Sequence, residues 1–273
     1  MPENNRFNDE DTIRENRVIK EDALLKPLER KTRRRRFVYA AMVIIAAAAF
    51  FTVVFTVFFK ISSVTVTGTE RYEAEDIAAA AGIEPGEPLY SFGSANAAER
   101  IKSEFPYVKE VNVTRRIPSS VEVEVTEETP AFVISVANDA YIVSDSFKVL
   151  ERLPAADAPE GLVRLNTGMV ENCTVGSALS FRETKLLDSL KTLWQTLEDY
   201  SQNGYVDYID AVNRFDIYFG FKGRIRVYLG DARECDAKIR FFIKIMEHIY
   251  DEQSGTLDIS DKKEATFAPY DTN

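Results

Sequence analysis

The sequence predicts an α+β protein in which a single transmembrane helix is followed by a small first domain and a larger second domain. Three observations lead to this fold class. Residues 37–59 carry no charged side chain, later stretches alternate apolar and polar residues with the period of a β-strand, and apolar residues recur at helical spacing near residues 186–197 and 235–249. At 273 residues and 45% hydrophobic content, the chain has apolar material for one or two folded domains.

Charge is distributed along the chain in three blocks. Residues 1–36 hold 11 Lys and Arg against 8 Asp and Glu, residues 37–59 hold none, and residues 60–273 hold 23 basic and 36 acidic side chains, for a net charge of -10. The acidic body lacks the basic face that nucleic-acid binding requires. Two cysteines and one histidine are too few for a His/Cys zinc cluster or a disulfide scaffold.

The uncharged block at residues 37–59 is long enough to cross a bilayer. At about 1.5 Å of rise per residue it spans roughly 34 Å, against a hydrocarbon core of about 30 Å. A cleaved signal peptide is the alternative, but its apolar region is about 7–15 residues long and ends at small residues. This block is longer and ends in Phe58-Phe59-Lys60. We therefore expect a retained single-pass anchor in the plasma membrane.

The charges that flank the anchor predict its orientation. Arg33, Arg34, Arg35 and Arg36 stand immediately before it, whereas only Lys60 follows closely. Positive charge accumulates on the cytoplasmic side of transmembrane helices. The four arginines are therefore the topology signal, residues 1–36 form a cytoplasmic basic tail that is mostly disordered, and the body lies outside the membrane.

Residues 61–128 predict a small domain with the order strand, helix, helix, strand, strand. The expected elements are a strand at residues 64–67, helices at 73–81 and 95–104, and strands at 108–113 and 121–126. Gly82 stands where a helix-terminating glycine belongs, and Pro106 ends the second helix.

Residues 130–260 predict a mixed α+β domain with an antiparallel sheet. Its expected elements are strands at 131–136 and 141–143, a helix from 180 to 203, strands at 205–211, 214–219 and 224–229, a helix from 231 to 249, and a strand at 256–259. Ser180 and Glu183 have the spacing of a capping box. Phe215, Ile217 and Phe219 are expected to share one face of their strand. Residues 261–273 read as a polar C-terminal tail.

The first domain resembles a POTRA domain. The resemblance is carried by Val64-x-Val66-x-Gly68, Ile77 to Ile83, Gly86-x-Pro88-Leu89, and Phe105-Pro106-Tyr107-Val108-Lys109-x-Val111-x-Val113 followed by Arg115 and Pro118. Behind a single anchor, it is similar to the FtsQ/DivIB family of bacterial cell-division proteins, and the second domain resembles that family's β-domain. Glu128 stands at the domain boundary where the family commonly has Arg, and Glu73 stands where a capping Ser or Thr is common.

The resemblance implies a bitopic scaffold of the divisome that has no enzymatic activity. Its partners would be bitopic coiled-coil division proteins of the FtsL/DivIC (FtsB) type and the septal peptidoglycan synthesis machinery, and its place would be the division septum. In the family, partner contacts lie around the last strand and the chain just after it. That implies a partner-binding edge strand at Thr256, Leu257, Asp258 and Ile259, which would accept a strand from a partner.

The residue types that carry catalysis are sparse. His248 is the one histidine, so a Ser-His-Asp system is absent, and we expect His248 on the surface. Asp207, Asp210 and Asp216 could form a carboxylate pair or a calcium site, but Asp207 and Asp216 are expected on the solvated face of strands instead. Cys235 is expected in the core, and its pairing with Cys173 stays open.

We therefore expect no catalytic residue, cofactor, metal, nucleic acid or small-molecule substrate. A membrane-anchored extracytoplasmic cell-wall hydrolase is the alternative function. An outer-membrane export protein would need a C-terminal barrel, for which the chain has no room.

Overall fold

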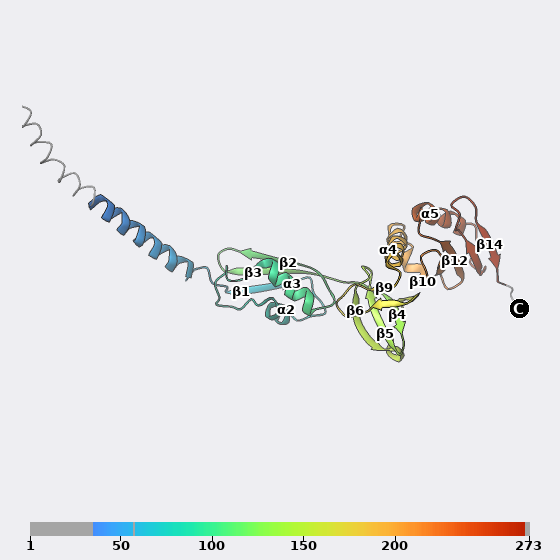
Figure 1. The fold of residues 1–273 in the computed structure, drawn as a ribbon, viewed down its shortest axis with the longest axis horizontal. Coiled ribbons are helices and arrows are strands. Elements are labelled where there is room, and N and C mark those ends of the chain that lie inside the picture. Colours follow the sequence, from blue (N-terminus) through green and yellow to red (C-terminus); the bar gives the residue numbers. More distant parts are fainter. Residues whose placement is uncertain (1–34, 57, 271–273) are drawn as a thin grey trace, which may run out of the picture.

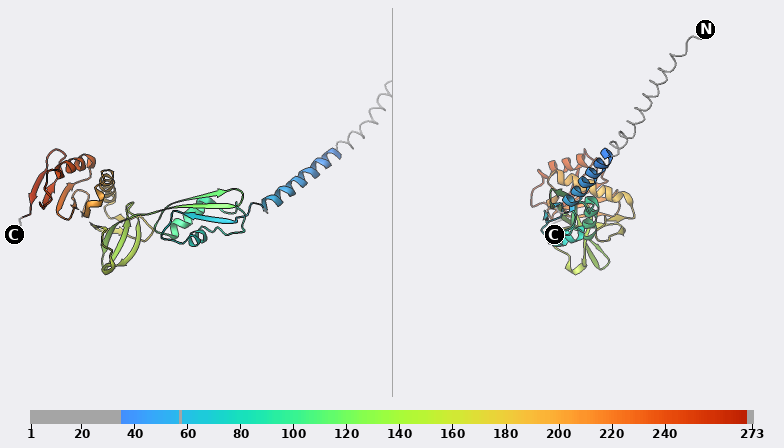
Figure 2. Two further views of the ribbon diagram at one scale, coloured as in Figure 1. Left: turned by 180° about the vertical axis from the view of Figure 1, so that it is seen from behind. Right: turned by 90° about the vertical axis from the view of Figure 1, so that its left-hand side faces the viewer.

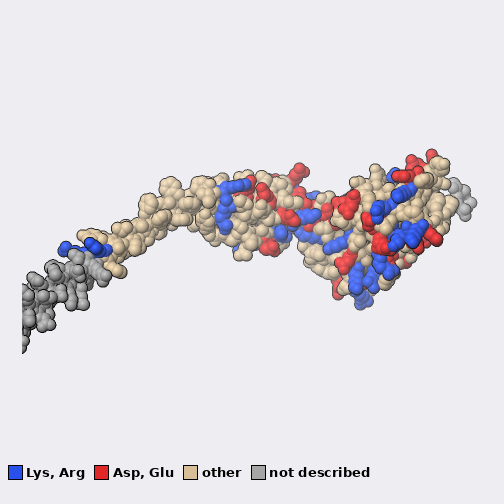
Figure 3. All heavy atoms as spheres, turned by 90° about the horizontal axis from the view of Figure 1, so that it is seen from above, with Lys and Arg blue, Asp and Glu red and all other residues tan. Residues whose placement is uncertain are grey.

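The computed structural model describes residues 35–56 and 58–270, and it shows a long helix followed by two domains in a row (Figures 1 and 2). The helix, Arg35–Thr56, has a mean hydropathy of 2.5, and no part of its most apolar window is buried in the protein. Figure 3 shows an uncharged surface along it, with basic side chains at its N-terminal end. Its two hydroxyls return to the helix backbone, since Thr52 donates to Ala48 O and Thr56 donates to Thr52 O, both at 2.8 Å. The helix therefore has the composition and length of a membrane anchor.

The first domain has the expected strand and helix order. Its elements are β1 (Ser63–Thr67), α2 (Ala74–Ala81), α3 (Ser94–Glu104), β2 (Val108–Arg116) and β3 (Ser120–Glu127). The sheet order is β1-β3-β2, with β1 parallel to β3 and β2 antiparallel to it. Both helices pack on one face, where Ile77, Leu89 and Ile101 are fully buried against the strand valines.

The ends of α2 follow from single residues. Glu73 precedes the helix and makes no side-chain capping bond, so the helix start lacks the bond that a Ser or Thr at this position can supply. Gly82 ends the helix with φ +66°, the left-handed conformation that glycine adopts without strain. The N–H of Ile83 then bonds to Ala78 O at 3.2 Å.

The second domain is one large mixed sheet. Within the described residues, its nine strands run in the spatial order β14-β13-β12-β11-β10-β7-β4-β5-β6. They are β4 (Pro130–Val136), β5 (Asp139–Ser144), β6 (Val149–Pro154), β7 (Val163–Thr167), β10 (Val206–Ala211), β11 (Ile217–Phe221), β12 (Ile225–Gly230), β13 (Gly255–Asp258) and β14 (Thr266–Pro269). The pairs β4·β7, β7·β10 and β12·β13 are parallel, so the expected antiparallel sheet is in fact mixed.

Helices α4 (Thr184–Asp199) and α5 (Cys235–Met246) cover one face of this sheet (Figure 1). Leu186, Leu190, Leu193 and Leu197 of α4 are buried, as their helical spacing predicts. The rings of Phe219 and Phe221 meet the ring of Phe242 from α5 edge-on, with centroids 5.5 and 5.0 Å apart. The opposite face of β10 to β14 carries no helix among the described residues.

Two local expectations are wrong. Ser180 does not cap α4, because it lies in a two-strand ribbon formed by β8 (Val170–Asn172) and β9 (Ser180–Phe181). Glu183 is the residue before the helix, and its carboxylate accepts bonds from Arg214 instead of from the helix start. Phe215 is not on the strand face of Phe219, since it lies in the turn before β11 and is 56% exposed.

The two domains are joined by direct contacts. The Tyr107 hydroxyl donates to Glu151 Oε2 at 2.9 Å, and Lys148 Nζ donates to Val108 O at 2.8 Å. Tyr107 packs with Ile142 and Leu150 in a small apolar cluster between the sheets. Glu128 is buried at this junction and accepts a bond from Ser146 Oγ at 2.9 Å.

Candidate partner-binding surface

The expected partner-binding strand is not the edge of the sheet. Thr256, Leu257 and Asp258 lie in β13, and Ile259 follows it, but β14 pairs antiparallel with β13 on its outer side. The segment at residues 261–273, expected to be a polar tail, therefore contains the true edge strand. Leu257 lies opposite Phe267, and both side chains pack on the helix side of the sheet.

Among the described residues, no strand pairs with the outer side of β14, so its main-chain groups are free there. Tyr270 N donates to Ser254 O at 2.9 Å. Because antiparallel pairs alternate, the groups of Thr266 and Ala268 also face β13, whereas those of Phe267 and Pro269 face outward. Pro269 has no N–H, so Phe267 supplies an outward donor and both residues supply outward carbonyls. The edge is short, but it can receive a few main-chain hydrogen bonds from an extended peptide.

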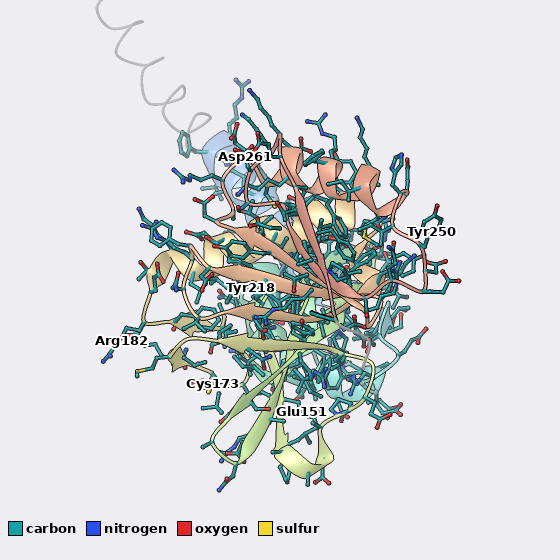
Figure 4. The ribbon with its side chains drawn as sticks, turned by 90° about the vertical axis from the view of Figure 1, so that its right-hand side faces the viewer. Glu151, Cys173, Arg182, Tyr218, Tyr250 and Asp261 are labelled. Carbon is teal, nitrogen blue, oxygen red and sulfur yellow. The ribbon has the colours of Figure 1, made fainter. Side chains whose placement is uncertain are left out.

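The helix-free face beside this edge is rich in tyrosine and arginine. Two rows of residues cross six neighbouring strands of the sheet, namely β7, β10, β11, β12, β13 and β14. The strand register determines which residues lie side by side in each row. The first row is Arg164, Tyr208, Gly220, Arg226, Thr256 and Ala268, and the second is Asn166, Asp210, Tyr218, Tyr228, Asp258 and Thr266. We call these two rows the tyrosine face. Figure 4 views this end of the molecule and labels Tyr218 on it.

Stacking holds the middle of the tyrosine face together. The rings of Tyr218 and Tyr228 lie 4.6 Å apart, and the Arg226 guanidinium lies 4.3 Å above the Tyr218 ring. Arg226 also pairs loosely with Asp210 at 3.8 Å, and Asp210 accepts a bond from Asn166 at 2.6 Å. Nε of Arg226 is buried without a hydrogen-bond partner. Together with Trp, Tyr and Arg are the residues most enriched at the energetic centres of protein interfaces.

Gly220 leaves room for the ring of Tyr208. A Cβ placed on Gly220 would lie 2.3 Å from Cε1 of Tyr208, so any side chain there would displace the ring. Burial is the main cause that raises the pKa of Tyr208 and of Tyr228 above 10.0. Both hydroxyls therefore remain protonated and can donate hydrogen bonds at neutral pH.

The residues considered for catalysis do not come together. His248 is exposed, and its Nδ1 lies 2.9 Å from Lys244 O. Asp207 accepts a bond from Gly223 N, and Asp210 belongs to the tyrosine face. Cys173 is half-buried and Cys235 buried, and the two thiols are unpaired. Within the described ranges, no three His, Cys, Asp or Glu side chains are grouped so that they could hold a metal ion.

The topology signal is only partly visible. Arg35 and Arg36 open the long helix, while Arg33 and Arg34 lie outside the described residues, as does most of the expected cytoplasmic tail.

Sequence reasoning missed β14 and the tyrosine face. The signal for the face was present, since Tyr208, Tyr218, Arg226 and Tyr228 all occupy alternate positions opposite buried residues.

Comparison with known proteins agrees with this architecture. The family model described as "POTRA domain, FtsQ-type" matches residues 59–128. A cell division protein DivIB of Clostridium botulinum is 24% identical over 205 residues, covering 74% of this chain and 79% of that protein. A cell division protein FtsQ of Corynebacterium glutamicum is 25% identical over 178 residues, covering 65% of this chain and 74% of that protein.

A third relative extends the match. A cell division protein FtsQ of Geotalea daltonii is 24% identical over 216 residues, covering 76% of this chain and 75% of that protein. The matches thus reach well beyond the POTRA domain, into the domain that carries the nine-stranded sheet. Together with the apolar helix ahead of an FtsQ-type domain, they show that the chain resembles the FtsQ/DivIB cell division proteins over much of its length.

Proposed function

We propose that the protein is a bitopic scaffold of the division machinery that binds partners through its second domain. The helix Arg35–Thr56 holds it in the plasma membrane, with the N-terminus in the cytoplasm and both domains outside. Its relatives carry the names of cell division proteins, which supports a role in division. On this proposal, the protein contributes binding energy and position at the septum rather than catalysis.

The observation that carries the proposal is the free outer side of β14 beside the tyrosine face. Phe267 and Pro269 direct main-chain groups away from the sheet, and Thr266 and Ala268 continue the two rows of the tyrosine face to its rim. A partner strand added at β14 gains main-chain hydrogen bonds from the edge. Its flanking residues can then pack on the tyrosine and arginine side chains, which give specificity.

The chemistry of this surface fits a protein segment with both apolar and acidic side chains. Tyr218 and Tyr228 offer ring area, while Arg164 and Arg226 offer cationic groups on the same face. Bitopic coiled-coil division proteins of the FtsL/DivIC (FtsB) type are the proposed direct partners, and septal peptidoglycan synthesis proteins the proposed assembly. Thr256 to Ile259 do not form the edge of this surface, because their strand, β13, lies between β12 and the edge strand β14.

The proposal is tested by purifying the full-length protein from membranes in mild detergent and identifying the bound chains. Phe267→Pro removes the outward donor and leaves the groups that face β13 in place, so it should release the coiled-coil partners. Phe267→Ala keeps the N–H and should retain them. Matching thermal unfolding of the two variants separates lost binding from lost folding. Full retention of the partners by Phe267→Pro would rule out the β14 edge.

Orientation is tested separately with spheroplasts. External protease should digest the two domains and leave residues 1–36 protected. The opposite pattern of digestion would overturn the proposed topology. Turnover of peptidoglycan by the purified protein alone would favour the hydrolase instead.

A further inference from the structure

The end of the POTRA domain nearest the helix exposes large apolar and aromatic side chains. Tyr90 is 56% exposed, and Ile117, at the turn between β2 and β3, is 69% exposed. Lys60, also exposed, links the helix to the domain through a bridge with Pro88. We call Lys60, Tyr90 and the turn Ile117–Ser119 the tip.

Strand order fixes the tip next to the helix. β1 begins at Ser63, only a few residues after the helix, and β3 runs parallel beside it from Ser120. The turn that precedes β3 must therefore lie where the chain leaves the helix. Direct bonds confirm it, since Ser62 N donates to Ser119 O at 2.7 Å and the two hydroxyls lie 2.9 Å apart.

A chain of aromatic contacts joins the tip to the last turn of the helix. The rings of Phe55 and Phe59 stack with centroids 4.9 Å apart, and the Phe59 ring lies 6.3 Å from that of Tyr90. Arg115 continues the series, with its guanidinium 5.6 Å from the Tyr90 ring and its Nε bonded to Leu89 O at 3.0 Å. Tyr90 therefore contacts Phe59, and Phe59 in turn contacts Phe55, a side chain of the helix itself.

The charge of the tip differs from that of the rest of the body. Residues 56–63, 88–93 and 114–120 contain Lys60, Arg115 and Arg116 and no acidic side chain, whereas residues 60–273 as a whole are strongly acidic. Two acidic groups border these segments: Glu122 pairs with Arg116 at 2.7 Å, and Glu87 accepts a hydrogen bond from Ser91 Oγ at 3.2 Å. The tip, with Arg115 and Arg116 beside it, therefore presents an aromatic ring, an aliphatic side chain and cationic groups together, a combination that suits the headgroup region of a bilayer.

We propose that the tip lies in the outer leaflet of the membrane that the helix spans, with Tyr90 at the headgroup level and Ile117 at the acyl boundary. This inference rests on the membrane anchoring proposed above. Tyr is enriched at this depth, and Lys60 can extend its ammonium to lipid phosphates while its stem stays apolar. The contact gives the POTRA domain a second attachment to the bilayer, so the two domains project at a fixed angle from it.

The test uses full-length protein reconstituted in vesicles of phosphatidylcholine and phosphatidylglycerol whose acyl chains carry bromine near the headgroup. Bromine quenches tryptophan by contact. Ile117→Trp is compared with Val212→Trp, a matched position that is 71% exposed in the second domain. The native Trp194 is buried and common to both proteins. We expect quenching of the added tryptophan at 117 and none at 212.

Flotation of the vesicles separates the two proposals. Protein that fails to float with the vesicles would overturn the anchor and, with it, the tip contact. Protein that floats but shows no quenching at 117 would overturn the tip contact alone. Fluorescence at 117 that changes only when a division protein is added would show that the tip binds protein rather than lipid.

Discussion

Tyr107 of the POTRA domain donates its hydroxyl hydrogen to Glu151 of the second domain, with 2.9 Å between Oη and Oε2. The Arg71 guanidinium lies 3.8 Å from the centre of the Tyr107 ring, and Glu128 N bonds to Tyr107 O at 2.7 Å. Tyr107 thus contacts a β6 carboxylate and a cation through its side chain, and it binds the chain that links the domains through its carbonyl oxygen. These contacts connect the POTRA domain to the second domain.

Removal of this hydroxyl should weaken the junction. Tyr107→Phe keeps the ring and leaves the half-buried Glu151 carboxylate without its donor, so we expect a loss of about 1–3 kcal/mol in the free energy of unfolding. Urea denaturation of the soluble part that begins at Phe58 measures it. Tyr205→Phe, at an exposed tyrosine, is the control and should leave the free energy of unfolding nearly unchanged. Equal stability of both variants would contradict a role for the Tyr107 hydroxyl.

The same hydroxyl predicts a loss of stability at high pH. Burial, and then the hydrogen bond to Glu151, raise the pKa of Tyr107 from 10.0 to about 12. A group whose pKa is raised by folding contributes stability that is complete below its unfolded pKa and is lost as pH rises through the folded value. The contribution should therefore disappear between pH 10 and about 12. Stability curves that fall equally with pH for the wild type and Tyr107→Phe would refute this assignment.

The environment of Glu127 predicts that the protein loses stability at low pH. Burial would raise its pKa, but hydrogen bonds from Thr69 Oγ1 at 2.7 Å and from the N–H groups of Arg71 and Glu70 bring the pKa below 4.5. A lowered pKa stabilises the fold above the unfolded value, and this stability is lost as pH falls below 4.5. Glu127→Gln should be less stable at pH 7 and should show a shallower decline in acid. Parallel acid curves for the two proteins would argue against it.

Substitution of Gly220 should disturb the packing of the tyrosine face and leave the rest of the fold in place. Gly220→Ala places a methyl group against the Tyr208 ring and should shift the ring, costing roughly 1–3 kcal/mol of stability and weakening partner binding. Gly204→Ala, where no atom lies within 4 Å of the new Cβ, is the matched control. Adding Tyr208→Ala to Gly220→Ala should restore stability by removing the clash. Unfolding curves of the three variants check the account, which fails if Gly220→Ala matches Gly204→Ala.

Local patterns predicted much of this fold because they act over a few residues. Val121, Val123 and Val125 alternate in β3 and are buried, and Cys235, Ile239 and Phe242 form the buried stripe of α5. The position of Gly82 at the end of α2 is likewise a local requirement of the backbone. These features needed no knowledge of distant contacts.

The errors concern pairings between distant segments. Ser180 and Glu183 match a capping box, but Ser180 is drawn into a ribbon with Asn172. The edge was misplaced because the residues of β14 lack a clear alternation and include Pro269, so only their pairing with β13 reveals a strand. The tyrosine face depends on register across six strands, which no local pattern specifies.

The most direct test is amide hydrogen exchange at Phe267, measured in the full-length protein alone and in its complex with the coiled-coil division proteins. Its N–H faces outward from β14 and should exchange readily in the free protein. The account predicts strong protection of this amide in the complex, while amides already bonded to β13 change little. Unchanged exchange at Phe267 in a complex that remains assembled would contradict the claim that partners bind by adding a strand at β14.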